Sequence, residues 1–180
     1  MEIQGDKIFI RYFEDTDVEA LLDLHLRNKE FFQKYSPTFD EDYYTIDKQL
    51  KFISDTIKNR EKDNQYCFGI FIKENGILVG DVNLFHIFRG PLQSCLIGYS
   101  LDKQYNGKGY TTEAISLAVR YAFDEAKLHR VEAGVMPWNI GSMRVLEKVG
   151  FNKEGIAQKS VKINGKWEDH QMFSMLSDNN

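Results

Sequence analysis

The 180-residue sequence has few cysteines and prolines and no excess of basic residues. It contains two cysteines, Cys67 and Cys95, three prolines and a net charge of −4. No CxxC or HExxH pattern occurs, so we expect no metal site and two reduced, buried thiols rather than a disulfide. The acidic balance argues against a nucleic-acid partner, because nucleic-acid binding requires a basic surface.

Long apolar runs are also missing. No stretch approaches the roughly 20 apolar residues of a membrane-spanning helix. The N-terminal residues MEIQGDKIFIRYF carry early acidic side chains and lack the apolar segment of a signal peptide. We therefore expect a cytoplasmic protein with no membrane partner. Because the chain has no repeats and no linker-like tract, we expect one domain over residues 1–180.

The apolar residues, 42% of the chain, alternate between strand and helix periods. Strands are predicted at 7–13, 65–72, 77–87, 95–101, 129–136, 155–163 and 167–176. Helices are predicted from residue 15 or 16 to 32, from 46 to at least 57, at 111–126 and within 139–151. This order predicts an α/β domain around a mixed sheet, and not a doubly wound one.

A glycine-containing segment, QYNGKGYTTEA (Gln104–Ala114), links a predicted strand to a predicted helix. The first N–H groups of a helix have no internal partner, and that end of the helix is electropositive. Glycines permit close approach, while Lys108, Thr111 and Thr112 add a charge and two hydroxyls. The segment is typical of an anion site, although on spacing alone a glycine pair between a strand and a helix is more often just a tight turn.

Three known phosphate-binding loops do not match this segment. A P-loop requires Gly-Lys followed by Ser or Thr, and no such tripeptide is present. A dinucleotide fingerprint would place a third glycine at Thr112. A kinase glycine loop would be accompanied by a DFG motif, which is absent. The spacing of Gly107 and Gly109 alone does not identify the ligand.

A second motif, NIGSMRVLEKVGF (Asn139–Phe151), follows after one more predicted strand. Together the two motifs resemble the GNAT acetyltransferases, and within them the ribosomal-protein alanine N-acetyltransferases. The resemblance extends to the opening strand and helix, to GILVGDVNL and to the closing hairpin, so it covers nearly the whole chain. It implies the acyl-CoA N-acyltransferase fold of the α+β type, with a mixed, mostly antiparallel central sheet that is splayed in the middle and flanked by helices.

The resemblance implies acetyl-CoA as co-substrate. In such proteins the glycine turn holds the pyrophosphate, and the preceding strand pairs with the pantetheine arm. The expected cofactor-binding residues are Tyr99, Ser100, Leu101, Gln104, Gly107, Lys108, Gly109, Tyr110, Thr111, Thr112, Asn139 and Ser142. For Asn139, capping of the following helix is a second reading that is compatible with cofactor binding.

The resemblance also suggests catalytic residues. Many GNAT enzymes have a tyrosine acid where this sequence has Leu146, so that role is excluded here. Ser142 matches the serine of the ribosomal-protein subgroup and is expected to donate a proton or hydrogen bond to the sulfur, with helix capping as the alternative. Glu132 is a candidate base acting through water, with an ion pair to Arg130 or Arg144 as the alternative.

The acceptor side is expected in the loop 33–45 and in the segment 85–91, both rich in aromatic residues. The expected acceptor-binding residues are Tyr35, Phe39, Tyr43, Phe85 and Phe88, with Asp40, Glu41 and Asp42 attracting a cationic amine; ordinary packing and a solvated turn are the alternative.

The acceptor itself is expected to be a primary amine. A free α-amine, with a pKa of about 7.7–8.0, deprotonates more easily than a lysine at about 10.4, which favours a protein N-terminus, and the resemblance points to a ribosomal protein. A small-amine acetyltransferase for polyamines or aminoglycosides, and a non-catalytic acyl-CoA-binding regulatory domain, remain alternatives. Exposed strand edges in the closing hairpin also permit a homodimer.

Overall fold

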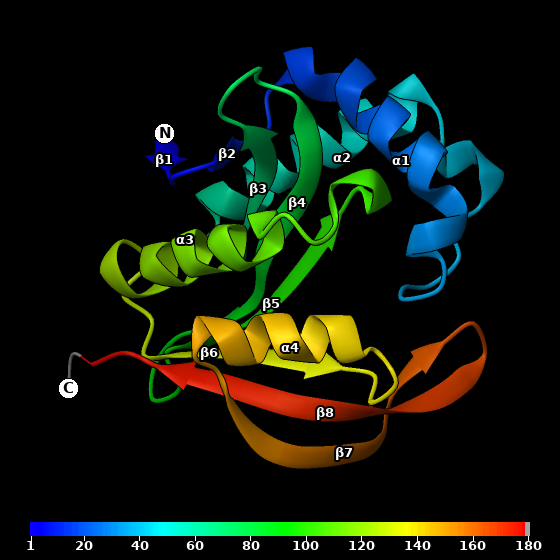
Figure 1. Ribbon diagram of the computed structural model, residues 1–180. Coiled ribbons are helices and arrows are strands. Elements are labelled where there is room, and N and C mark those ends of the chain that lie inside the picture. Colours follow the sequence, from blue (N-terminus) through cyan, green and yellow to red (C-terminus); the bar gives the residue numbers. More distant parts are fainter. Residues whose placement is uncertain (179–180) are drawn as a thin grey trace.

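The computed structural model describes residues 1–178, which form one sheet with helices on both of its faces (Figure 1). The strands are β1 (Glu2–Gln4), β2 (Ile8–Tyr12), β3 (Gln65–Ile72), β4 (Leu78–Phe88), β5 (Ser94–Leu101), β6 (Arg130–Val135), β7 (Asn152–Ile163) and β8 (Lys166–Leu176). The α-helices are α1 (Val18–Phe32), α2 (Ile46–Glu61), α3 (Tyr110–Asp124) and α4 (Ile140–Val149). Short 3-10 helices are η1 (Asp15–Asp17), η2 (Glu41–Tyr43) and η3 (Lys103–Tyr105).

The strand order is β1-β2-β3-β4-β5-β6-β8-β7, and every neighbouring pair is antiparallel except β5 with β6. That parallel pair joins only residues 94–96 to residues 130–132. From Ile97 to Leu101, β5 therefore has no strand partner on its β6 side, while β4 pairs with it on the other side. The mixed, mostly antiparallel and splayed sheet that the resemblance implied is confirmed.

Two apolar cores cover the two faces of the sheet. The larger lies under α3 and α4, with Ile115, Ala118 and Leu146 among its fully buried residues. The smaller lies under α1 and α2 and includes Leu24 and Ile53. In Figure 1, α3 crosses in front of the strands and α2 lies behind them. Because both faces are covered, the parting of β5 from β6 lies between two helical layers.

The ends of α4 follow the predicted capping chemistry. Asn139 Oδ1 accepts a hydrogen bond from the Ser142 N–H at 3.2 Å. Gly150 has a φ of +111°, and the N–H groups of Gly150 and Phe151 both donate to the Leu146 carbonyl. These contacts satisfy main-chain groups that a helix leaves open at its ends. They fix the start of α4, and with it the position of Ser142, beside the splay.

Some features differ from the predictions. Strand β1 was not predicted, because its three residues carry mostly exposed side chains and offer no apolar alternation. Helix α1 begins at Val18, after the 3-10 turn η1. Cys67 and Cys95 are buried free thiols, as expected. Within residues 1–178 no helix is long and apolar enough to span a membrane. Strand β7 forms an outer edge of the sheet, and a homodimer through it stays a prediction.

Candidate active site

The splay between β5 and β6 opens into a cavity of about 810 Å³. Its walls come from α1 and the loop after it, from one residue of α2, from β4 and β5, from the turn before α3 and the first turn of α3, and from one side of α4 along its length. Two parts of the wall differ in chemistry. The glycine end consists of Asn106, Gly107, Gly109, Tyr110, Thr111 and Thr112. The aromatic end consists of Phe31, Phe32, Tyr35, Phe39, Tyr43, Tyr44 and Phe52.

The glycine end presents a row of free main-chain donors. Gly107 and Gly109 have φ values of +79° and +87°, a conformation that favours glycine, and Gly109 is the N-cap of α3. No atom lies within 4 Å of the Cβ position at either glycine, so the space beside them is open. No described residue accepts a hydrogen bond from the N–H groups of residues 107–112. This arrangement suits an anionic oxygen-rich group such as a pyrophosphate.

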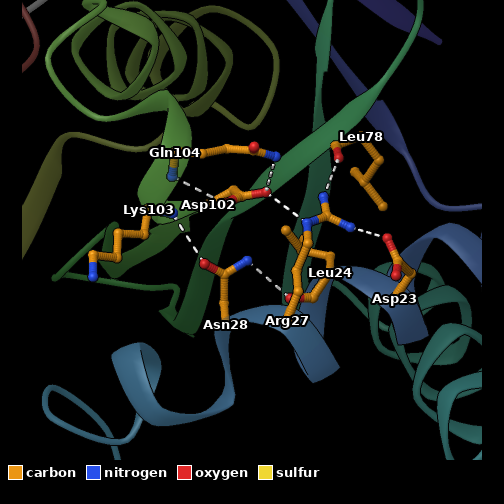
Figure 2. A network of polar contacts seen from close by, with 8 residues as sticks. All are labelled: Asp23, Leu24, Arg27, Asn28, Leu78, Asp102, Lys103 and Gln104. Atoms are coloured by element: carbon orange, nitrogen blue, oxygen red, sulfur yellow. Dashed lines mark hydrogen bonds and ion pairs between the residues drawn. The ribbon is translucent and has the colours of Figure 1, made fainter.

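A network of polar contacts holds the turn that precedes these donors (Figure 2). Asp102 accepts from the main-chain N–H of Gln104 at 3.1 Å and from its Nε2 at 3.2 Å. Arg27 of α1 donates through Nε to Asp102 at 2.7 Å and also pairs with Asp23. Gln104 does not line the cavity, so its predicted contribution reduces to shaping the turn.

A second residue of α1 joins the same network. Asn28 is buried, its Oδ1 accepts from the Lys103 N–H at 3.0 Å, and its Nδ2 donates to the Leu24 carbonyl at 3.0 Å (Figure 2). The aromatic end of the cavity begins a few residues later on the same helix, at Phe31. Helix α1 therefore connects the cavity's two ends through these hydrogen bonds.

Asp102→Asn should lower the free energy of unfolding at pH 7 by about 1–3 kcal/mol, since Arg27 would lose the buried one of its two carboxylate partners. Burial opposes ionisation of Asp102, but the hydrogen bonds from Arg27 and Gln104 outweigh it and hold the carboxyl pKa below its usual value. This stabilisation is present above the unfolded-state pKa of about 3.9 and is lost as pH falls through the folded-state pKa. The difference in the free energy of unfolding between the parent protein and Asp102→Asn, measured by urea unfolding, should therefore become smaller from pH 5 to pH 3.

Asp55→Asn, on the exposed face of α2, serves as the matched control because it removes one carboxylate without touching the turn. It should leave the unfolding free energy within about 0.5 kcal/mol of the parent. If Asp102→Asn and the parent protein differ by the same free energy of unfolding at pH 7 and at pH 3, the charge of the carboxylate does not stabilise the turn.

The middle of the cavity holds a pair of hydroxyls. Tyr99 Oη lies 2.6 Å from Ser142 Oγ, and either oxygen can donate. Burial raises the pKa of Tyr99 to about 12, so the phenol is neutral and carries a proton. The cap at this helix end is made by Asn139, which leaves the Ser142 hydroxyl free of the capping role. Leu146 is fully buried, consistent with the absence of a tyrosine acid at that position.

Glu132 and Lys108 lie outside the cavity lining. Arg130 donates to Glu132 Oε1 through Nε at 3.0 Å and Nη2 at 2.9 Å, and it also pairs with Glu154. This ion pair is the alternative that the sequence left open, and we propose no base at Glu132. Lys108 turns its Nζ over the ring of Tyr105, 4.7 Å from the centroid.

The other predicted cofactor residues line the cavity together. They are Tyr99, Ser100, Leu101, Gly107, Gly109, Tyr110, Thr111, Thr112, Asn139 and Ser142. Two cationic side chains of α4, Arg144 and Lys148, also line it and were not predicted. Their charges suit an anionic ligand along the same wall.

The predicted acceptor residues divide into two groups. Tyr35, Phe39 and Tyr43 line the aromatic end, and the rings of Phe39 and Tyr43 stack 4.1 Å apart. Phe85 and Phe88 do not line the cavity. They pair with Leu96 and Ser94 at the end of β5 that is still closed against β6, so β4 carries them away from the splay.

The acidic residues of the loop before α2, Asp40, Glu41 and Asp42, do not line the cavity either. Glu41 pairs with Lys29 at 2.6 Å, and Asp42 pairs with Lys48 at 2.7 Å. Both carboxylates are exposed and already have cationic partners within this chain. The predicted attraction of a cationic amine by these two residues is therefore not supported by their positions.

Among the polar residues of the cavity that the sequence reasoning missed are His25, Asp81 and Asn83. His25 Nδ1 lies 3.0 Å from Gln49 Oε1, and burial lowers the pKa of His25 to about 4. Asp81 accepts a hydrogen bond from Ser100 Oγ, and burial raises the pKa of Asp81 to about 6. The available signal was the placement of Asp81 and Asn83 two residues apart in an otherwise apolar strand.

Comparisons with known proteins agree with this architecture. The family model described as "Acetyltransferase (GNAT) domain" matches residues 7–152. The chain belongs to the GNAT family and is an acetyl-CoA-dependent N-acetyltransferase. The free N–H groups at 107–112, the unpaired edge of β5 and the cations of α4 fit the phosphates and the pantetheine arm of acetyl-CoA.

Particular relatives span the whole chain. The probable N-acetyltransferase YjcK of Bacillus subtilis is 54% identical over 97% of both chains. The [ribosomal protein uS5]-alanine N-acetyltransferase of Escherichia coli is 29% identical, covering 98% of this chain and 91% of its own. The ribosomal-protein-S5-alanine acetyltransferase of Vibrio fischeri superposes with a TM-score of 0.93 at 27% identity, covering 99% of this chain and 98% of its own. Mycobacterium smegmatis RimJ, solved in complex with CoA-disulfide, superposes with a TM-score of 0.90 at 25% identity, covering 95% and 82%.

Proposed function

We propose that this enzyme acetylates the N-terminal α-amine of a ribosomal protein by direct attack of the amine on the thioester in a ternary complex. The observation that carries the proposal is the continuous cavity from the N–H groups of residues 107–112, past Ser142, to the aromatic end. A cavity open to both partners suits simultaneous binding better than a covalent relay. The names of the Escherichia coli and Vibrio fischeri relatives support the same class of acceptor. Such an acceptor implies a cytoplasmic enzyme.

Each end of the cavity has a distinct task in this proposal. The N–H groups of residues 107–112 hold the pyrophosphate, and the unpaired edge of β5 from Ile97 to Leu101 hydrogen-bonds the amides of the pantetheine arm. The rings of Tyr35, Phe39 and Tyr43 surround the first residues of an extended peptide. Aromatic walls exclude water from the reacting amine, which strengthens electrostatic interactions there.

Ser142 donates a hydrogen bond or proton to the sulfur as the thiolate leaves. Its hydroxyl lines the cavity and lies beside the neutral Tyr99 phenol, 2.6 Å away, which can keep the serine oriented and supplied with a proton. A donor placed where negative charge develops stabilises the transition state more than the ground state. Ser142 thus takes the role for which many relatives use a tyrosine four residues later.

A panel of acceptors tests the proposal by measuring coenzyme A release. We expect the highest kcat/KM for a hexapeptide that begins with alanine. The control is the same hexapeptide with an acetylated N-terminus and one internal lysine, and it should give less than about 1% of that rate because the lysine pKa of about 10.4 leaves little neutral amine. Turnover of spermidine or an aminoglycoside, without turnover of the alanine peptide, would contradict the ribosomal acceptor and favour a small-amine enzyme.

A further inference from the structure

Asp81 of β4 lines the cavity and has no role in the reaction as described above. Among the described residues that line the cavity, it alone carries a carboxylate side chain. Its Oδ1 accepts from the hydroxyl of Ser100, its partner across the β4–β5 pair, and no ion pair to it is formed by any residue from 1 to 178. A half-buried carboxylate without a cationic partner is costly, so this site gains stability when a cation enters it.

The groups around Asp81 leave its charge uncompensated. His25 of α1 has a pKa lowered to about 4 by burial and is neutral near pH 7. The pKa values of Tyr43 and Cys67 are raised, first by burial and then by the negative charge of Asp81. The two cations that line the cavity, Arg144 and Lys148, both belong to α4. Strand β4 therefore supplies the negative charge of this cavity and α4 the positive charge.

We propose that Asp81 binds the ammonium group of the acceptor and then accepts its proton, acting as the general base of acetyl transfer. This inference rests on the proposed function, since it names the residue that receives the acceptor amine. The aromatic rings beside it, Tyr43 among them, also favour a cation through their negative faces. Glu41 and Asp42 of the loop before α2 already have cationic partners and do not compete for this role.

The proton balance of the step is simple. The ammonium gives one proton to the Asp81 carboxylate, and the neutral nitrogen attacks the thioester carbonyl. The N–C bond forms, the C–S bond breaks, and the bonding electron pair leaves on the sulfur. The nitrogen gives up its second proton as the amide forms, the sulfur takes up one proton through Ser142, and Asp81 returns the first proton to solvent. Ammonium and thioester thus become amide, thiol and one released proton without any further reactant.

The pH dependence follows from these protonation states. Because burial raises the pKa of Asp81 to about 6, kcat/KM should fall below pH 6, where the protonated carboxyl can neither pair with ammonium nor accept a proton. The titratable groups that face it are His25, Tyr43, Cys67 and Tyr99, and none of their shifted pKa values lies between 5 and 8. The acidic limb is therefore assigned to Asp81.

Asp81→Asn is the direct test, since the amide keeps the size of the side chain and can still accept from Ser100. With acetyl-CoA and the alanine-initiated hexapeptide, kcat/KM at pH 6.5 should fall roughly 100-fold. The loss should shrink at higher pH, because only the neutral amine now reacts and its fraction rises about tenfold per pH unit up to about pH 7.7–8.0. The dissociation constant for acetyl-CoA should stay within about twofold, which a general loss of structure would not allow.

Two further variants support the interpretation of Asp81→Asn, one that should shift the pH profile and one control that should not. Ser100→Ala removes the hydrogen bond that lowers the pKa of Asp81, so the acidic limb of kcat/KM should move to higher pH. Asp55→Asn, on the exposed face of α2, should leave the whole pH profile unchanged. If Asp81→Asn fails to fold, the shift of the acidic limb in Ser100→Ala still decides the question.

An acidic limb that keeps its midpoint near pH 6 in Asp81→Asn, or a loss of less than about threefold at pH 6.5, would overturn the proposal. The measurement is repeated with spermidine, so that whichever probe the parent enzyme turns over can be used. If only spermidine reacts, the ribosomal acceptor is wrong while the role of Asp81 is still tested. If the peptide reacts and the profiles do not change, the acceptor stands and the role of Asp81 fails.

Discussion

Replacing Ser142 with alanine is expected to lower kcat by roughly 1,000-fold and to leave the dissociation constant for acetyl-CoA within about twofold. The hydroxyl lines the cavity next to Tyr99, while the cap of α4 uses the Ser142 N–H and Asn139, which alanine preserves. The loss should therefore appear in turnover and not in folding. Steady-state kinetics combined with calorimetric binding of acetyl-CoA separates the two.

Two companion variants sharpen this expectation. Ser116→Ala, which removes an exposed hydroxyl of α3 bonded to the Thr112 carbonyl, should leave kcat within about twofold. Tyr99→Phe removes the partner of Ser142 Oγ and should lower kcat by about tenfold without changing acetyl-CoA affinity. Full activity of Ser142→Ala would remove the serine from the mechanism and leave the sulfur to take its proton from solvent.

Gly109→Ala is expected to weaken acetyl-CoA binding by roughly 300-fold, which corresponds to the loss of about two charge-assisted hydrogen bonds. The Cβ would enter open space beside the donors of residues 107–112, where the pyrophosphate is proposed to lie. The residue also has a φ of +87°, so alanine adds backbone strain of about 1–2 kcal/mol. Calorimetric titration with acetyl-CoA measures the first effect, and urea unfolding measures the second.

Gly76→Ala is the matched control for this strain. Gly76 has a φ of +69° and open space at its Cβ position, but it lies in the β3–β4 turn and does not line the cavity. It should lose a similar free energy of unfolding and bind acetyl-CoA normally. Equal losses of affinity in both variants would mean that strain, and not the donor row, accounts for the effect.

Much of the fold could be predicted because short segments of the sequence mark the ends and the type of many helices and strands. The strand at 65–72 was predicted at its observed bounds, and Asn139 and Gly150 marked the two ends of α4. The turn at Asn164-Gly165 joins β7 to β8 as expected. Each of these depends on capping chemistry, turn chemistry or apolar periodicity within a short segment. Strand β1 gave no such signal, because its stability comes from pairing with β2.

The sequence predicted those residues of the candidate site whose positions are set by the strand or helix next to them in the chain. The turn at Gly107 and Gly109 and the serine at 142 are each set by a strand and a helix that adjoin them, and they lie together in one cavity. Asp81 was missed because the sequence of its strand does not show that the helices covering that face of the sheet leave a cavity beside it. Phe88 was misplaced for a related reason, since its distance from the splay depends on where β5 parts from β6.

A crystal structure with coenzyme A bound tests the central claim most directly, namely that one cavity holds the cofactor at the glycine end and the acceptor at the aromatic end. We predict pyrophosphate oxygens within about 2.7–3.2 Å of main-chain nitrogens of residues 107–112, and the sulfur beside Ser142 Oγ. The carboxylate of Asp81 should then face the sulfur from the opposite side of the part of the cavity that is left for the acceptor. A pyrophosphate held elsewhere, or a sulfur remote from both Ser142 and the aromatic end, would contradict the account.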